Sequence, residues 1–216
     1  MSSSRAAAAD AVFALAPVVP VLVLDNTEQA LAVGRALLAG GLSALEVTLR
    51  TPRALECIAA LASLPAAMVG AGTVLDPGAA EAAVAAGASF LLSPGSSPPL
   101  VAWAETAAVL FVFGVATATE AMTLAERGFD RLKFFPAETS GGANSLAALA
   151  SPLPGLRFCP TGGVTSENAS RYLALPNVAC VGGSWVTPKD AVKGRDWDRI
   201  ERLAREAAAL PRRASS

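Results

Sequence analysis

The sequence predicts an α/β protein built as a single (β/α)₈ TIM barrel with an extra helix at its N-terminus, residues 1–16. Eight short runs rich in Val, Leu, Ile and Phe recur about every 20 to 25 residues, and Ala-rich stretches of helical composition separate them. Parallel strands need a crossover connection, which a helix supplies, so this alternation predicts a parallel sheet. Eight such units within 216 residues favour one closed barrel over two small domains or an open sheet, although periodicity alone leaves closure open.

The expected strands are nearly continuous apolar runs, which indicates that both faces of the sheet are covered. They lie at residues 18–24, 44–49, 66–71, 89–92, 109–112, 131–134, 156–159 and 178–181. The expected helices alternate with them, at residues 28–38, 54–61, 78–86, 99–106, 119–127, 145–150, 166–173 and finally 196–210. Residues 211–216 are expected to be a disordered tail, and no linker divides residues 1–216 into separate domains.

The composition excludes several classes of function. The formal net charge is -1 and there is no basic run, which argues against a nucleic-acid partner. The chain has no histidine, so His-based triads and histidine general bases are excluded. Catalysis would therefore have to use Lys, Glu, Asp, Arg or hydroxyl groups.

The cysteines and the N-terminal segment indicate a cytoplasmic protein without a metal. Cys57, Cys159 and Cys180 lie in apolar runs at no metal-ligand spacing, so no metal and no other cofactor is expected. An odd number of cysteines in such contexts is typical of a reducing compartment. Asp10 and Pro17 interrupt the apolar N-terminal segment, which argues against a signal peptide or a membrane anchor.

A polar face on the second expected strand is the first candidate for a functional site. The period of two along a strand puts Glu46, Thr48 and Arg50 on one face, with apolar residues on the other. A strand with one solvated face is the commoner cause of such an alternation. Because the other strands read as buried on both faces, we favour the barrel interior, where a buried Glu and Arg need a partner such as a substrate.

Lys133 is the candidate nucleophile. It lies between Leu132 and Phe134 on the sixth expected strand, where an ammonium group is poorly solvated. Desolvation favours the neutral amine, which attacks a carbonyl to form an imine. The alternative is a lysine whose head group reaches water beyond the end of the strand. The expectation that Glu46 and Arg50 face the same cavity favours the catalytic interpretation.

Glycine-rich loops after the last two strands are candidates for phosphate binding. Pro-Thr-Gly-Gly at 160–163 follows the seventh expected strand, and Gly-Gly-Ser at 182–184 follows the eighth. Glycines let backbone N–H groups approach a ligand, and these two loops frequently bind phosphate in barrels. Thr73 and Pro94, after strands three and four, are candidates for a carboxylate contact and an apolar wall, although each reads by default as an ordinary turn residue.

Seven stretches of the chain resemble the bacterial 2-keto-3-deoxy-6-phosphogluconate (KDPG) aldolase family, also called 4-hydroxy-2-oxoglutarate aldolases. They are VVPVL (18–22), LEVTLRT (45–51), VGAGTVL (69–75), SPG (93–95), KFFPAE (133–138), RFCPTGGV (157–164) and VGGSW (181–185). Their order and spacing match the family across about residues 17–208, and as a set they are highly specific.

The resemblance implies a class I (Schiff-base) aldolase and assigns roles residue by residue. The products would be pyruvate and glyceraldehyde 3-phosphate from KDPG, or pyruvate and glyoxylate from 4-hydroxy-2-oxoglutarate. A homotrimer without a metal, in the Entner–Doudoroff route, is also implied. The imine-forming lysine falls on Lys133 and the general acid/base on Glu46, and the carboxylate contact falls on Arg50 with Thr73. Other substrate contacts fall on Pro94, Phe135 and Thr161, and the phosphate contacts on Gly162, Gly163, Gly183 and Ser184.

One position departs from the family's pattern. Relatives usually carry a proline directly before the glycine of the fifth strand, where this chain has Phe113 before Gly114. We expect the larger side chain either to narrow the aldehyde side of the pocket or only to repack the loop. The departure therefore bears on the range of substrates and not on the core chemistry.

Three other functions are compatible with the sequence. A sister aldolase acts on 2-keto-3-deoxy-6-phosphogalactonate, which differs at one hydroxyl, and the sequence does not separate the two. A trimeric barrel kept as an assembly scaffold would suit the high apolar fraction, but it would have no use for Lys133, Glu46 and Arg50. A phosphate-binding isomerase is disfavoured, because no second acid/base group accompanies Glu46.

Overall fold

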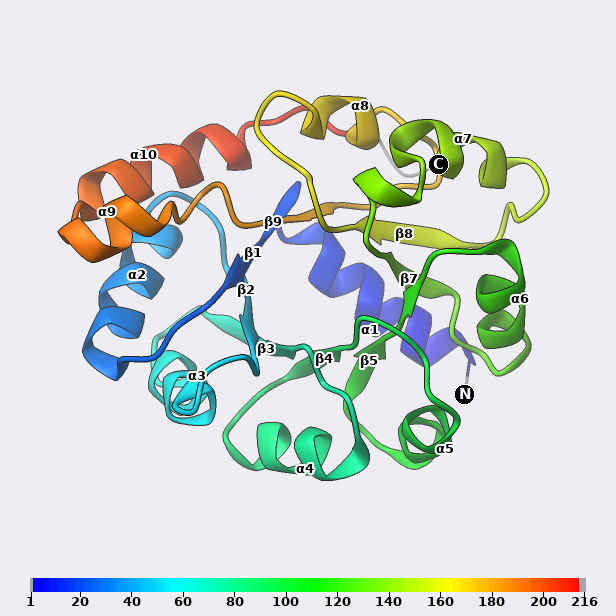
Figure 1. Ribbon diagram of the computed structural model, residues 1–216, viewed down its shortest axis with the longest axis horizontal. Helices are drawn as coiled ribbons and strands as arrows, with labels where there is room; N and C mark the ends of the chain where they lie inside the picture. Colours follow the sequence, from blue (N-terminus) through cyan, green and yellow to red (C-terminus); the bar gives the residue numbers. More distant parts are fainter. Residues whose placement is uncertain (1, 214–216) are drawn as a thin grey trace.

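The computed structural model describes residues 2–213, in which short parallel strands form a ring surrounded by helices (Figure 1). Every strand pairing among these residues is parallel, as in the predicted barrel. The strands are β1 (Val18–Leu22), β2 (Ala44–Thr48), β3 (Met68–Gly72), β4 (Phe90–Leu92), β5 (Leu110–Val112), β6 (Gly114–Val115), β7 (Arg131–Phe134), β8 (Arg157–Pro160) and β9 (Val181–Gly183).

The labelled strands form the eight strands of the barrel, because β5 and β6 are two parts of one strand that Phe113 interrupts. The Lys133 amide donates to the Phe113 carbonyl at 2.8 Å, which carries the β7 ladder across the interruption. The two hydrogen-bonded sheets run β5-β4-β3-β2-β1-β9 and β6-β7-β8. A bridge from Thr161 to Gly182 joins β8 to β9, so the predicted TIM barrel is confirmed.

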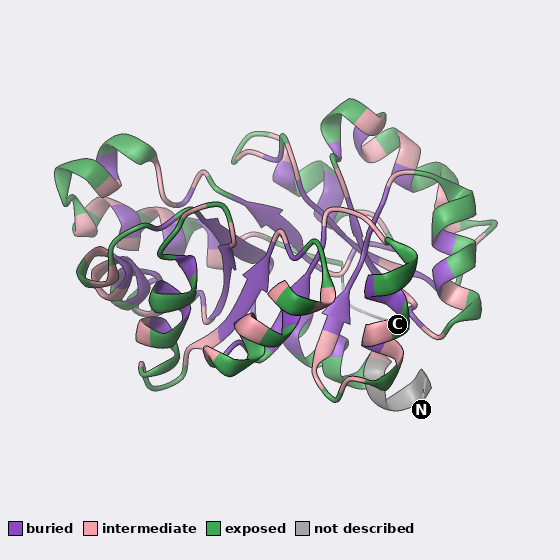
Figure 2. Cartoon of the chain, turned by 60° about the horizontal axis from the view of Figure 1, so that its bottom comes forward, coloured by how far each residue is buried: buried purple, intermediate pink, exposed green. Residues whose placement is uncertain are grey.

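Helices cover the outside of the ring, and Figure 2 shows the strands buried while the outward faces of the helices are exposed. No helix within residues 2–213 is both long and apolar enough to cross a membrane. The helices are α1 (Ser2–Ala14), α2 (Thr27–Ala39), α3 (Ala54–Ala62), α4 (Pro77–Ala85), α5 (Pro98–Thr106), α6 (Ala118–Glu126), the 3₁₀ helix η1 (Glu138–Ser140), α7 (Gly142–Ala150), α8 (Ala169–Leu173), α9 (Lys189–Gly194) and α10 (Trp197–Ala208).

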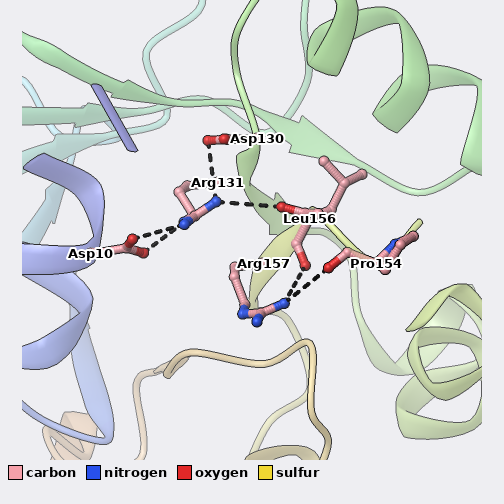
Figure 3. Close-up of polar contacts among 7 residues, drawn as sticks. Asp10, Asp130, Arg131, Pro154, Leu156 and Arg157 are labelled. Atoms are coloured by element: carbon pink, nitrogen blue, oxygen red, sulfur yellow. Dashed lines mark hydrogen bonds and ion pairs between the residues drawn. The ribbon is translucent and has the colours of Figure 1, made fainter. Parts of the chain in front are cut away.

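Helix α1 covers the end of the barrel where the strands begin. Phe13 of α1 packs in the same buried cluster as Ala44 and Phe90, which lie at the starts of β2 and β4. The Arg131 guanidinium donates to both carboxylate oxygens of Asp10, at 2.6 and 2.8 Å, and so ties α1 to the start of β7 (Figure 3). With that end occupied, the opposite end, where the strands finish, is left for a ligand.

The last strand lies later in the chain than the sequence predicts. We expected residues 178–181, but β9 is Val181–Gly183, preceded by an isolated bridge at Val178. The two glycines that read as a loop belong to the ladder, since Gly182 and Gly183 pair with Val19 and Pro20 of β1.

Helices α8 and α9 also differ from the prediction. The helix expected from residue 166 begins at Ala169, because the Asn168 side chain holds the preceding loop. Its oxygen accepts from the Thr165 amide at 2.8 Å and its nitrogen donates to the Gly163 carbonyl at 3.0 Å. Helix α9 was not predicted at all. It has six residues, and Ala191 is the buried one among them, too few for a helical period.

Residue 1 of the expected N-terminal helix and residues 214–216 of the expected tail lie outside the described residues. Within residues 211–213, the Arg212 guanidinium donates to the carbonyls of Phe13 and Ala14, at 3.0 and 2.7 Å. The Arg213 amide donates to the Leu173 carbonyl at 3.1 Å. These bonds join the C-terminal segment to α1 and α8.

Candidate active site

Lys133 of β7 points into the barrel and meets Glu46 of β2. The flanking residues Leu132 and Phe134 are buried in the larger core cluster, which includes the apolar faces of the helices, so the strand alternation turns Lys133 inward. Lys133 Nζ donates to Glu46 Oε1 at 2.8 Å. The lysine side chain is 6% exposed and the glutamate side chain 1%, so the lysine head group does not extend into bulk water.

The surroundings of the pair are tightly shaped. The Phe135 ring centroid lies 5.5 Å from Lys133 Nζ, close enough for a cation–π contact. On the adjacent strand β3, a Cβ at Gly72 would lie 2.1 Å from Glu46 Oε1, so only glycine leaves room for the carboxylate there. Toward the start of the strands, Cys180 is fully buried, and burial raises the pKa of its thiol. These three neighbours of the pair, Phe135, Gly72 and Cys180, carry no charged side chain.

Thr48, the middle residue of the predicted polar face, is buried, and its hydroxyl donates to the Leu22 carbonyl at 2.9 Å. The hydroxyl proton of Thr48 therefore joins β2 to β1. We predicted Arg50 on the same strand face as Glu46 and Thr48, and this prediction is wrong. Strand β2 ends at Thr48, and the Arg50 amide donates back to the Thr48 carbonyl at 2.8 Å in a tight turn. The turn breaks the alternation and leaves Arg50 exposed.

A cavity of about 910 Å³ opens where the strands finish, at the ends of β1, β8 and β9. Seven of the predicted site residues line it, namely Arg50, Phe135, Thr161, Gly162, Gly163, Gly183 and Ser184. Lys133 and Glu46 are not part of its lining, but Phe135, which contacts Lys133, is. Thr161 is likewise two residues beyond Cys159, the partner of Lys133 in the β7–β8 ladder. The cavity therefore lies directly beyond the buried pair.

The Gly162–Gly163 loop has the geometry of an anion site. Both glycines have positive φ, +97° and +79°, a region that favours glycine. Their carbonyls accept from the Glu138 amide at 3.0 Å and the Asn168 side chain at 3.0 Å. Their N–H groups have no hydrogen-bond acceptor within residues 2–213, and such successive N–H groups bind anions.

Glu138 holds this loop from behind. A Cβ at Gly163 would lie 2.7 Å from the Cβ of Glu138, so the segments that contain these two residues are in direct contact. The buried Tyr172 hydroxyl of α8 donates to Glu138 Oε1. Burial is the larger cause and this hydrogen bond the smaller cause of a raised pKa for the Tyr172 hydroxyl. The hydroxyl therefore keeps its proton and remains a donor. Glu138 and Tyr172 are not among the predicted site residues, because neither a strand alternation nor a glycine-rich loop marks their contact.

Thr73 and Pro94 lie on loops at the same end of the barrel, but neither lines the cavity. Thr73 has a φ of 60°, unusual for a residue other than glycine, directly after β3. The Pro94 carbonyl would lie 2.2 Å from a Cβ at Gly114, so the loop after β4 packs against β6.

Phe113 does not narrow the cavity. Its side chain is fully buried, its ring stacks on Phe111 at 4.3 Å, and it meets Phe129 edge to face at 4.9 Å. These neighbours belong to the core cluster outside the strands, so the first of our two expectations is wrong. The phenylalanine instead packs with Phe111 and Phe129 on the outer side of the interrupted strand.

Three basic residues that were not predicted as site residues also line the cavity. They are Lys189 and Lys193 of α9, together with Arg195 just after this helix. One feature of the sequence could have indicated that Lys189 and Lys193 belong to the site. The chain has three lysines, Lys133, Lys189 and Lys193, and two of them follow the last glycine-rich loop closely.

A family model described as KDPG and KHG aldolase matches residues 9–203 of the chain. The chain belongs to the KDPG and KHG aldolase family. It is 46% identical to the KHG/KDPG aldolase of Escherichia coli strain K12 over 200 residues, 92% of this chain and 94% of the relative. It is accordingly an aldehyde-lyase, a class I aldolase.

Two solved structures of aldolases share the fold. The KDPG aldolase of Zymomonas mobilis ZM4 with 3-phosphoglycerate is 46% identical, with a TM-score of 0.92 over 96% of this chain and 98% of that one. The KDPG aldolase of Legionella pneumophila, with pyruvate captured as a covalent carbinolamine, is 44% identical. Its TM-score is 0.91, over 93% of this chain and 98% of that one.

Proposed function

We propose that the protein cleaves KDPG to pyruvate and glyceraldehyde 3-phosphate, and 4-hydroxy-2-oxoglutarate to pyruvate and glyoxylate. The observation that carries the proposal is the buried 2.8 Å hydrogen bond between Lys133 and Glu46, next to a cavity lined by cations. Both substrates are 2-keto acids, so the same amine would attack the same carbonyl group in each. The similar enzyme of E. coli is named for both activities.

Formation of the imine uses the two residues together. Glu46 takes a proton from the Lys133 ammonium across their hydrogen bond, and the neutral amine adds to C2 of the substrate. After a proton moves from nitrogen to oxygen, Glu46 protonates the carbinolamine hydroxyl, which leaves as water. The product is a protonated imine on Lys133.

Cleavage uses the imine as an electron sink. Glu46 accepts the proton of the C4 hydroxyl while the C3–C4 bond breaks, and the bonding electrons form an enamine. The aldehyde leaves, and Glu46 returns its proton to C3. Water then hydrolyses the imine, which releases pyruvate and the free amine of Lys133.

The remaining residues would hold the substrate in place. Arg50, whose guanidinium has no ion-pair partner within residues 2–213, would bind the carboxylate with help from Thr73. Pro94, Phe135 and Thr161 would contact the carbon chain. The unpaired N–H groups of Gly162 and Gly163 would bind the phosphate, with the backbone of Gly183 and the hydroxyl of Ser184.

We also propose a single-domain homotrimer that acts in the cytoplasm, in the Entner–Doudoroff route. Several large apolar side chains are exposed on the chain, among them Val23 at 53%, Leu75 at 59% and Met122 at 50%, and association would cover such groups. Light scattering during size exclusion tests the assembly. A mass of about three times 21.8 kDa supports the trimer, and a mass of one chain contradicts it.

A coupled pyruvate assay tests the reaction. We expect cleavage of KDPG to exceed cleavage of its galactonate epimer. Preference for the epimer would assign the protein to the sister activity, and no pyruvate from any of the three substrates would leave the assembly scaffold as the remaining interpretation.

A further inference from the structure

We infer that Lys189 and Lys193 of α9 form a cationic rim that draws phosphorylated substrates into the cavity and sets the preference for them. This inference rests on the proposed function and extends it to residues outside the anion loop. Both lysines line the cavity, whose lining does not include Lys133 or Glu46.

The charged residues that line the cavity all have the same sign. Among residues 2–213, the four charged residues that line the cavity are cations, Arg50, Lys189, Lys193 and Arg195, and no Asp or Glu lines it. The whole chain, by contrast, has 17 basic and 18 acidic residues. A cleft lined by charges of one sign concentrates its field, and it raises the on-rate of an oppositely charged ligand about 10- to 1,000-fold.

Nearby carboxylates do not neutralise the two lysines. Asp190, the acidic residue of α9, pairs with Arg199 at 2.6 Å. Glu28 faces Arg195 at 3.7 Å, which reduces the charge that Arg195 offers. Lys189 and Lys193 have no ion-pair partner in the part of the chain that the structure describes. They are therefore the available charges of the rim.

The rim is held in position over the cavity. The Gln29 side chain of α2 donates to the Val192 carbonyl at 3.4 Å, and the Asp196 side chain caps the start of α10 directly after α9. Lysine suits this task, because its ammonium acts as a point charge on a mobile stem and does not require one fixed geometry.

The substrate charges explain the expected preference. A phosphate adds about 1.5 to 2 negative charges at pH 7, so KDPG carries roughly three times the charge of 2-keto-3-deoxygluconate, which lacks only the phosphate. The rim should therefore assist the first substrate much more than the second. Because both lysines are exposed, salt should screen the effect.

The experiment compares the Lys189→Gln/Lys193→Gln double variant with wild type on these two substrates, from low to high ionic strength. At low ionic strength we expect kcat/KM for KDPG to fall about tenfold through a higher KM, and for the unphosphorylated substrate less than about twofold. The difference should vanish near 1 M salt, where the Debye length is about 3 Å. Arg35→Gln/Arg202→Gln, which removes two exposed cations that do not line the cavity, is the matched control.

Equal losses on both substrates, losses that persist at high salt, or the same losses in the control would overturn the inference. Borohydride trapping of pyruvate on the double variant separates this failure from failure of the aldolase proposal. An adduct on Lys133 together with unchanged salt dependence overturns the rim alone, whereas wild type without turnover or adduct overturns both.

Discussion

Lys133 on β7 and Glu46 on β2 are joined by a 2.8 Å hydrogen bond across the interior of the barrel, although 87 positions separate them in the chain. Their strands are not neighbours, so closure of the barrel brings the two together. Breaking a buried ion pair by removing one partner typically costs about 3–5 kcal/mol, because the other charge is left alone. The cavity at the ends of the strands, lined by Phe135 next to Lys133, is the route that we expect a 2-keto acid to take to the pair.

Glu46→Gln should lower kcat by about a hundredfold or more, because the amide has the shape of the carboxylate but cannot accept the proton. A coupled pyruvate assay measures the loss, with circular dichroism to verify folding. Glu56→Gln, on the surface of α3, is the control. A loss of only a few fold would mean that Glu46 is structural.

Gly72→Ala should disable the site although it replaces neither Lys133 nor Glu46. The new Cβ would lie 2.1 Å from Glu46 Oε1 and force the carboxylate away from Lys133. A displacement of about 1 Å costs roughly a hundredfold in rate. At Gly95 no atom lies within 4 Å of an added Cβ, so Gly95→Ala serves as the matched control. Equal activity of both variants would contradict the close packing of Glu46.

Much of this site follows from the alternation of side chains along strands. Leu132 and Phe134 pack outward, as their apolar character requires, so Lys133 must point inward, and the same argument applies to Glu46 between Leu45 and Val47. The sequence therefore predicts that both side chains enter the barrel. It does not predict the distance between them, which depends on how eight strands tilt and close.

Other features depend on local geometry that periodicity does not encode. The turn after Thr48 takes Arg50 out of the strand, and nothing in an alternating pattern marks where a strand ends. The sequence predicts that Phe113 narrows the pocket or repacks the loop, but its ring packs with Phe111 and Phe129 outside the strands. Helix α9, which brings Lys189 to the cavity, is too short for a periodic signal.

Ser184→Leu should weaken phosphorylated substrates selectively, because the larger side chain would occupy the anion side of the cavity. We expect KM for KDPG to rise about tenfold, equivalent to roughly 1.4 kcal/mol. KM for 2-keto-3-deoxygluconate should change little. Steady-state kinetics on the two substrates provides its own control, and equal losses on both would contradict the phosphate assignment.

Tyr172→Phe should loosen the anion loop through Glu138. Loss of a hydrogen bond to a charged group should lower the free energy of unfolding by about 1.5–3 kcal/mol, measured by urea denaturation, and raise KM for KDPG. An unchanged stability would contradict the contact.

The stability difference between wild type and Tyr172→Phe should also depend on pH. Burial, followed by the hydrogen bond to Glu138, raises the pKa of Tyr172 in the folded protein. The stabilisation is therefore fully present below about pH 10, the usual tyrosine pKa, and is lost as the pH rises above it. The stability difference between wild type and Tyr172→Phe should shrink in that range, and a difference that grows would contradict the sign of the shift.

Borohydride reduction in the presence of pyruvate tests whether Lys133 forms the imine, since it fixes an imine to the amine that formed it. Because the chain has three lysines, peptide mapping has few sites to distinguish. We expect one reduced adduct, on Lys133, and none after Lys133→Arg. An adduct on Lys189 or Lys193, or no adduct on the wild-type protein, would contradict this expectation.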